Sequence, residues 1–394
     1  MELTRQEEMA LNGEHGEGLQ LAYKILLALG NANDATKLIP IKWAHISGVN
    51  FNTIGEAGVR FLSGLDKKNK VKVPTTLNPM GYDPKKNNNN LSDYFKSNQI
   101  SIINSYSSLG IKPSFTCIPY EIFDLPDKGE IVSFAESNAA VFVNSMLGIK
   151  TNKESALSSL ASAISGKTPY SDLLLDSVRN PKINVKIETN IETESDFGLL
   201  GYFAGKMIDE SCIGLLDINS EQLGKINSKA LSAGIGTSGR AGMFTTAAAT
   251  TTSRNKSGCE RVSFGINEYN KIKDELNTAE KGEVIVFGSP QLGIDELEML
   301  NQLTDGKKFK RPCKIFCPRS VAEMECNNDV IKKLRNTGAD IICDACTCLT
   351  PLITKNDCDS IVTNSIKCAY YMKHSNKLDV SLKDMKTITK DYCE

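Results

Sequence analysis

Cysteine is the residue type best able to do chemistry in this chain, which has 12 cysteines among 394 residues. Thiolates are soft ligands that suit iron–sulfur clusters, and a cluster held by three of them leaves one iron open as a Lewis acid for a substrate oxygen. Cys117 stands far along the chain from Cys343, Cys346 and Cys348, so the spacing is not that of a compact ferredoxin run. Because free cysteines are among the most buried residues, a set of structural thiols is the alternative interpretation.

The elements that would position these cysteines are clearest in the last third of the chain, where short apolar segments alternate with helical patterns. Such alternation indicates a parallel sheet covered by helices on both faces. The expected strands span 283–287, 313–316 and 340–343, and the expected helices span 294–303 and 321–336. Ligands bind outside the carboxyl ends of parallel strands, which is where Ser289, Cys317, Cys346 and Cys348 fall.

The first half of the chain shows the same kind of alternation. A capping box of Thr4 and Glu7 predicts an N-terminal helix, which glycines after residue 12 divide into two pieces. A strand near 37–46 runs into a polar loop, and a strand over 113–120 would deliver Cys117 to the carboxyl end of a sheet. Further helices are expected over 131–147, 153–164 and 220–231.

Two other motifs have weaker chemical interpretations. The run from Gly234 to Gly239 matches the dinucleotide fingerprint, but the helical pattern before it is not the strand that the fingerprint requires. We therefore expect a glycine loop there, with Ser238 available for hydrogen bonds to substrate. Among only three histidines, His45 follows a strand and precedes a glycine, so it is either a functional group or a histidine hydrogen-bonded at a loop edge.

Composition narrows the class of protein. A formal net charge of −1 lacks the basic excess that nucleic-acid binding needs, so no nucleic-acid partner is expected. No apolar run approaches the length of a membrane helix, and the acidic start is unlike a secretory signal, so no membrane association is expected either. These observations predict a cytoplasmic protein, and in that reducing compartment the cysteines are expected to be thiols or ligands rather than disulfides.

Several segments, taken together, resemble the aconitase X family. Characteristic among them are Cys117-Ile118-Pro119-Tyr120, Ala135-Glu136-Ser137-Asn138-Ala139 and Asp344-Ala345-Cys346. Matching segments also lie at 11–16, 39–49, 75–79, 144–148, 151–154, 198–203, 238–239 and 362–365. The resemblance implies an aconitase-like, multi-lobed α/β/α fold with largely parallel sheets that lacks the swivelling domain. Residues 1–394 would form the catalytic large subunit, with subdomains near 1–190 and 191–394.

The resemblance also implies an activity and a partner. The expected reaction is that of an iron–sulfur hydro-lyase, which dehydrates (R)-5-phosphomevalonate to trans-anhydromevalonate 5-phosphate in an archaeal-type mevalonate pathway. The phosphorylated hydroxy acid would be bound by a heterodimer, in which a small swivelling-domain subunit supplies a serine base. Two alternatives stay open: another aconitase X dehydration, such as that of a hydroxyproline, and a non-catalytic subunit without a cluster.

Carried onto matching positions, the resemblance assigns the site residues. Cys117 and Cys346 would bind a 4Fe–4S cluster with one open iron, and the third ligand should lie in a Gly-Cys-Pro segment that here reads Gly288-Ser289-Pro290. Either Ser289 binds iron, or Cys317 or Cys348 replaces it, or the cluster chemistry is lost. The expected catalytic residues are Glu136, Ser137 and His45, and the expected substrate-binding residues are Lys42, Ser47, Gly48, Thr76, Asn78, Asn144, Asn152 and Ser238.

Overall fold

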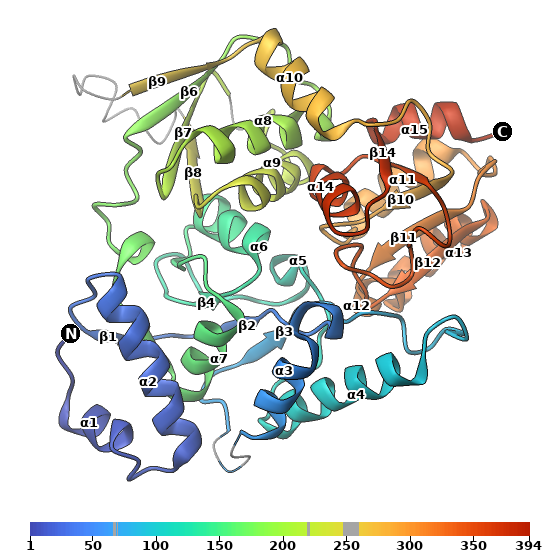
Figure 1. Ribbon diagram of the computed structural model, residues 1–394. Helices are drawn as coiled ribbons and strands as arrows, with labels where there is room; N and C mark the ends of the chain where they lie inside the picture. The colour runs from blue at the N-terminus through green and yellow to red at the C-terminus, as the bar shows by residue number, and fades with distance from the viewer. Residues whose placement is uncertain (66–67, 69, 219–220, 247–259) are drawn as a thin grey trace.

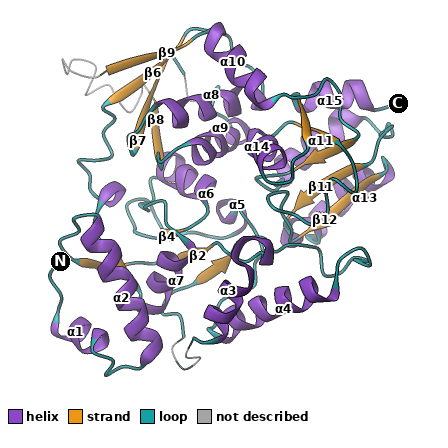
Figure 2. Cartoon of the chain, viewed as in Figure 1, coloured by secondary structure: helices purple, strands orange, loops and turns teal. Residues whose placement is uncertain are grey.

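A computed structural model describes residues 1–65, 68, 70–218, 221–246 and 260–394 of the chain (Figure 1). These residues form an α/β structure with three parallel sheets and one short antiparallel pair, and helices cover the sheets (Figure 2). The predicted α/β class with largely parallel sheets is therefore confirmed. No helix in these ranges is long and apolar enough to cross a membrane.

The N-terminal part is built around a small parallel sheet of order β3-β2-β4. The predicted capping box is present, because Thr4 and Glu7 each bond to the other's backbone at the start of α1. The helices are α1 (Arg5–Leu11), α2 (Glu17–Ala32), α3 (Phe51–Ser63), α4 (Asp93–Ser108), α5 (Pro119–Ile122), α6 (Ser137–Phe142) and α7 (Ala156–Ser165). The strands are β1 (Leu38–Pro40), β2 (Ala44–Ile46), β3 (Thr75–Leu77), β4 (Ser133–Phe134) and β5 (Lys167–Pro169), of which β1 and β5 form the antiparallel pair.

The middle part holds a four-stranded parallel sheet of order β8-β7-β6-β9. Its strands are β6 (Ile183–Ile187), β7 (Cys212–Leu216), β8 (Met243–Thr246) and β9 (Glu260–Phe264). Its helices are α8 (Glu194–Met207), α9 (Lys225–Ser238) and α10 (Ile266–Leu276). Figure 1 shows α6 below this layer, near the centre of the molecule and close to α5.

The C-terminal part holds a five-stranded parallel sheet of order β12-β11-β10-β13-β14. Its strands are β10 (Val284–Phe287), β11 (Cys313–Cys317), β12 (Ala339–Cys343), β13 (Ser360–Thr363) and β14 (Asp379–Leu382). Its helices are α11 (Ile294–Thr304), α12 (Arg319–Ala322), α13 (Asn328–Asn336), α14 (Ile366–His374) and α15 (Met385–Tyr392). The three strands predicted here are confirmed, and the helix predicted over 321–336 is divided into α12 and α13.

Alternation along β10 explains why this sheet is buried on both faces. Ile285 and Phe287 belong to the apolar core formed with α11, α13 and α15, whereas Val284 and Val286 belong to the core that includes α8, α9 and α14. Successive side chains of a strand point to opposite faces, so a strand buried on both faces must be apolar throughout. This requirement is what made the strand visible in the sequence.

Of the expected elements near the site, one is wrong and another is wrong only in its first residues. Residues 113–118 form a loop rather than a strand, and the chain then enters α5 at Pro119. Proline lacks the backbone donor that a strand ladder needs, and Pro119 suits the first turn of a helix. The segment expected to be helical over 131–147 begins with β4 and enters α6 only at Ser137, because residues 133 and 134 pair with β2.

The expected glycine loop is also wrong, since Gly234, Gly236 and Ser238 lie within α9. A Cβ on Gly234 would lie 2.3 Å from the carbonyl oxygen of Gly198 in α8. The glycines therefore let two helices pack closely, and no dinucleotide turn exists at this position. Residue 220, where the preceding helix was expected to begin, lies outside the described residues; α9 begins at Lys225.

Candidate active site

The candidate site lies where the small N-terminal sheet meets the five-stranded sheet. Segments that follow β2, β3 and β4 contact segments that follow β12 and β13. The backbone N–H of Met80 donates to the carbonyl of Asp344, and the Asn50 amide donates to the carbonyl of Leu349. Since these segments come from the carboxyl ends of parallel strands, the site occupies the position where such sheets bind ligands.

Three thiols and one hydroxyl meet at this edge. Cys117 and Ser289 are fully buried, whereas Cys346 and Cys348 are partly exposed. The Ser289 hydroxyl oxygen lies 2.9 Å from the sulfur of Cys348, and the thiol of Cys346 is hydrogen-bonded to both Cys117 and Cys348. The structure thus brings the two expected ligands together with both Ser289 and one of the proposed substitutes.

Hydrogen bonding shifts the pKa values of the three thiols in different directions. Bonds from Cys117 and Cys348 hold the pKa of Cys346 well below its ordinary value. Burial and then the bond to Cys346 raise the pKa of Cys117. The separate bond between Cys348 and Cys346, and then burial, raise the pKa of Cys348. Cys346 is therefore the sulfur most readily present as a thiolate, which is the form that binds metals.

Cys317, the other proposed substitute, belongs to a different pair. It lies opposite Cys343 on the neighbouring strand, and the two thiols are hydrogen-bonded to each other. The charges that act on this pair come from Asp83, Asp344 and Arg319. The structure therefore places Cys317 in a structural contact between β11 and β12.

Gln291, which the sequence analysis missed, connects the segments that carry the thiols. Its backbone N–H donates to the sulfur of Cys117 over 3.1 Å, and its side-chain oxygen accepts from the N–H of Cys117 over 3.2 Å. Its side-chain nitrogen donates to the carbonyl oxygens of Phe115 and Ala345. Gln291 is completely buried, and no sequence pattern marks a single glutamine of this kind.

A chain of hydrogen bonds runs from His45 toward the thiols. The Nε2 atom of His45 lies 2.8 Å from Oδ1 of Asn78, and Nδ1 lies 2.8 Å from the Thr76 hydroxyl. The Asn78 amide donates to Glu136 over 2.6 Å, and Lys367 forms a buried ion pair with the same carboxylate. Burial lowers the pKa of His45 to about 4, so the imidazole is neutral and donates from Nε2 to the amide oxygen.

Lys367 is the second functional candidate that the sequence analysis missed. Besides Glu136 it contacts Ser137 at 3.5 Å and Asn138 at 3.2 Å, and the Asn138 amide donates to the carbonyl of Cys117. Burial opposes the charge of Lys367, but Glu136 and then Cys348 outweigh it and raise the pKa of the lysine above its ordinary value. Its place at the start of a helix that follows a buried strand was the only available signal.

Lys153 places a second lysine near this ion pair. Burial, with a contribution from Lys367, lowers its pKa to about 8. Its ammonium donates to the carbonyl oxygens of Gly236 and Gly239 at the end of α9. A lysine in these surroundings can lose its proton near neutral pH more easily than a surface lysine.

The remaining expected residues are spread more widely. Ser47 is partly exposed beside Gly48, which has a φ of 75°. Lys42 is exposed, and the Ser238 hydroxyl donates within its own helix to Gly234. Asn144 is buried and donates to the carbonyls of Thr151 and Gly242, whereas Oδ1 of Asn152 is buried with no hydrogen-bond partner within the described ranges. Their roles in binding substrate stay predictions.

Three charged residues, Lys229, Glu121 and Glu296, form a buried cluster that contacts the segments carrying the thiols. Lys229 in α9 is 2% exposed and lies 3.0 Å from a carboxylate oxygen of Glu121, which follows Cys117 in the chain. It also pairs with Glu296 and donates to the carbonyl of Gln291 over 2.7 Å. The triad therefore joins α9 to the segments that follow Cys117 and Ser289.

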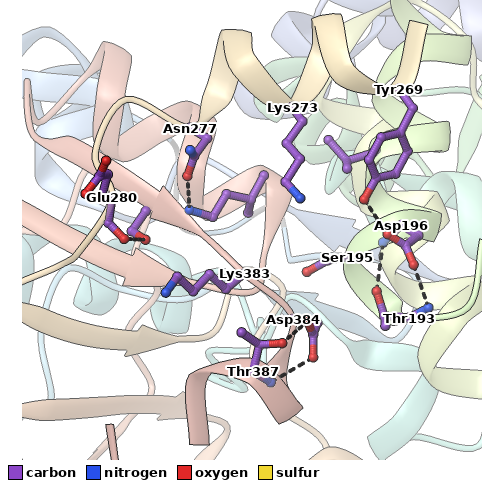
Figure 3. A pocket seen from close by; sticks show the side chains of 13 residues that line it. Thr193, Ser195, Asp196, Tyr269, Lys273, Asn277, Glu280, Lys383, Asp384 and Thr387 are labelled. Carbon is purple, nitrogen blue, oxygen red and sulfur yellow. Dashed lines mark hydrogen bonds between the residues drawn. The ribbon is translucent and has the colours of Figure 1, made fainter. Parts of the chain in front are cut away.

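A separate pocket of about 340 Å³ lies between α8, α10 and α15 (Figure 3). Two of its carboxylates already cap helices, because Asp196 accepts from the N–H of Thr193 and Asp384 accepts from the N–H of Thr387. Asp196 also accepts from the hydroxyl of Tyr269 over 2.7 Å. This pocket contains none of the expected site residues.

The donor chemistry of the thiol group fits an iron–sulfur cluster. Among the residues described, no three His, Cys, Asp or Glu side chains are arranged to hold a metal ion. Cys117, Cys346 and Cys348 nevertheless offer three sulfur donors on loop ends, and soft donors of this kind select iron–sulfur clusters over hard cations. The thiols are hydrogen-bonded to one another, and binding of iron would replace these hydrogen bonds.

Comparison with known proteins identifies the family. Models of the first, second and third domains of aconitase X match residues 1–177, 181–274 and 282–394. The phosphomevalonate dehydratase large subunit of Methanocaldococcus jannaschii is 32% identical over 99% of this chain and 100% of that protein. The chain belongs to the aconitase X family. The resemblance noted in the sequence is thereby confirmed.

Other aconitase X members show the range of the family. The phosphomevalonate dehydratase large subunit of Methanosarcina mazei is 34% identical over an alignment that covers 94% of this chain and 92% of that protein. A cis-3-hydroxy-L-proline dehydratase of Hypocrea jecorina is 30% identical over 94% of this chain but 65% of its own length. The crystal structure of Thermococcus kodakaraensis aconitase X (holo-form) matches with a TM-score of 0.89, 31% identity and full coverage of both chains. The relatives from Methanocaldococcus jannaschii, Methanosarcina mazei and Hypocrea jecorina are named as dehydratases, so the chain belongs to a family of hydro-lyases.

Proposed function

We propose that this chain is the large subunit of an iron–sulfur dehydratase that converts (R)-5-phosphomevalonate to trans-anhydromevalonate 5-phosphate. The observation that carries the proposal is the meeting of the thiol group with the Glu136–Lys367 ion pair at one edge of two parallel sheets. The choice of substrate is supported by relatives named phosphomevalonate dehydratase large subunit, which the chain matches over 92% to 100% of their length. Their names also support a small-subunit partner, which would complete the site with a serine base.

Loss of a hydroxyl group from a carboxylic acid needs three kinds of assistance. The departing hydroxyl needs a Lewis acid, the carboxylate needs hydrogen-bond donors, and the adjacent C–H proton needs a base. A 4Fe–4S cluster bound by Cys117, Cys346 and a third residue from Ser289 or Cys348 would supply the open iron. The chain's own polar groups would supply the second requirement.

Lys367 is placed to bind an anionic group of the substrate. Its ammonium has three donors, of which Glu136, Ser137 and Asn138 account for the present contacts. A substrate carboxylate would compete for the contact to Ser137, which is the longest of the three at 3.5 Å. Glu136 then holds the lysine charged and in place.

His45 acts as an orienting group in this arrangement. The neutral imidazole donates to Oδ1 of Asn78, which directs the Asn78 amide nitrogen toward Glu136. Glu136 can accept or return a proton within this closed set of hydrogen bonds and so act as a proton relay. Burial of His45 and Glu136 excludes water from the relay.

The test is to purify the chain anaerobically with its small subunit and measure iron, acid-labile sulfide and turnover. About four iron and four sulfide per heterodimer are expected for a 4Fe–4S dehydratase. Turnover of (R)-5-phosphomevalonate would appear as the loss of one water from the substrate mass, with unphosphorylated mevalonate as the matched control. Activity toward cis-3-hydroxy-L-proline alone would refute the substrate, and absence of iron and activity after reconstitution would indicate a non-catalytic subunit.

A further inference from the structure

We propose that Cys348, rather than Ser289, is the third protein ligand of the cluster, so that a thiol from a neighbouring loop has replaced the cysteine expected at position 289. This inference rests on the proposed cluster. It assigns three sulfurs, those of Cys117, Cys346 and Cys348, and gives Ser289 the role of a hydrogen-bonding neighbour.

Position is the first argument. The sulfur of Cys348 lies 2.9 Å from the hydroxyl oxygen of Ser289, although the two residues are 59 positions apart. The sulfur of Cys348 therefore lies beside the position that a cysteine sulfur at residue 289 would occupy. Thr347, which lies between Cys346 and Cys348, joins this loop to the segment that carries Ser289. Its hydroxyl donates to the carbonyl of Gly288 over 3.0 Å.

The connection among the thiols is the second argument. Cys348 is hydrogen-bonded to Cys346, which is in turn bonded to Cys117. The three sulfurs thus form one continuous group, whereas Cys317 is paired with Cys343 across two strands. Of the two cysteines that could substitute for the missing ligand, Cys348 is in contact with the expected ligands.

Ligand chemistry is the third argument. A ligand must lose its proton, and an alcohol does so far less readily than a thiol, while iron–sulfur clusters prefer soft sulfur donors. When Cys348 binds, its S–H bond breaks, the proton passes to solvent and the sulfur forms a bond to iron without any change of oxidation state. The buried Ser289 hydroxyl can then donate to the bound sulfur, an interaction that influences the reduction potential of a cluster.

The experiment compares the unaltered full chain with four variants, each reconstituted anaerobically with the small subunit. Ser289→Ala is expected to retain the iron and sulfide of the unaltered protein, with a more negative midpoint potential because one hydrogen bond to sulfur is lost. Cys348→Ser is expected to lose cluster iron and its electron paramagnetic resonance signal. Cys317→Ser is the matched control, since it removes another strand-end thiol, and it should keep both.

A fourth, double variant guards against simple misfolding. Ser289→Cys combined with Cys348→Ser returns the thiol to the expected position, so it should regain the iron that the single Cys348→Ser variant loses.

The outcomes separate the two proposals. If the unaltered protein binds no cluster, the proposed function fails and this inference fails with it. If the unaltered protein binds a cluster, retention of iron by Cys348→Ser, or loss of iron by Ser289→Ala, overturns the assignment of Cys348 alone. Iron retained by Ser289→Ala and lost by Cys348→Ser establishes it.

Discussion

Replacing Lys229 by methionine should destabilise the protein strongly, because this ammonium is the buried partner of two carboxylates. Lys229 is 2% exposed and contacts both Glu121 and Glu296. Burial opposes the lysine charge, but the two carboxylates outweigh burial and raise its pKa above the ordinary value. Since the pKa is raised in the folded state, the stabilisation is fully present below the unfolded pKa and is lost only at strongly alkaline pH.

The magnitude follows from the geometry. Removing one partner of a buried ion pair costs about 3–5 kcal/mol, because the other charge stays buried and uncompensated. Lys225, one helical turn earlier on α9, also contacts Glu121 and pairs with Asp295 at 2.7 Å, but its side chain is 46% exposed. Such an exposed pair contributes at most about 1 kcal/mol, so Lys225→Met is the matched control.

The assay is urea unfolding of both variants at pH 5.5 and pH 7.5, where the shift of the midpoint multiplied by the slope gives the change in free energy of unfolding. In Lys229→Met, acidification allows the buried carboxylates to take up protons, so the deficit should be smaller at the lower pH. Burial already raises the pKa of Glu296 in the intact triad, which favours this uptake. A deficit no larger than that of Lys225→Met, or one that grows on acidification, would refute the reasoning.

Three further predictions concern the site. In the intact protein the free energy of unfolding should fall by up to about 3 kcal/mol as the pH drops from about 6.5 to 4. The reason is that the unfolded chain protonates His45 in this range, whereas the folded pKa of His45 is about 4. Unfolding measured at several pH values should show that His45→Gln removes this dependence. Gln291→Leu should lower the retention of iron about 10-fold to 100-fold in a chelator challenge, since it leaves the Cys117 N–H and two carbonyls unpaired, and unchanged retention would contradict its positioning role. Lys367→Met should reduce kcat/KM with phosphomevalonate while the iron content stays, and Lys367→Arg should restore part of the loss; equal kcat/KM in the methionine variant would exclude a role in substrate binding.

The C-terminal sheet could be predicted because its strands are buried on both faces and so are continuously apolar. The predicted positions of Ser289 and Cys346 after these strands followed directly from that pattern. The strand expected over 113–120 was wrong for a local reason, since two prolines prevent a regular ladder there. The glycines of α9 were misjudged because their purpose is close contact with another helix, which a local pattern does not express.

The sequence by itself determined the α/β class, the family and the residue types available for chemistry, because these depend on local periodicity and on ordered motifs. The tertiary structure decided which of those residues meet. Ser289 and Cys348 are 59 positions apart, and Glu136 and Lys367 are 231 positions apart, yet each pair is in contact. Such contacts depend on the order of strands in two sheets and on how the sheets face each other, and neither is encoded in the periodicity of any one segment.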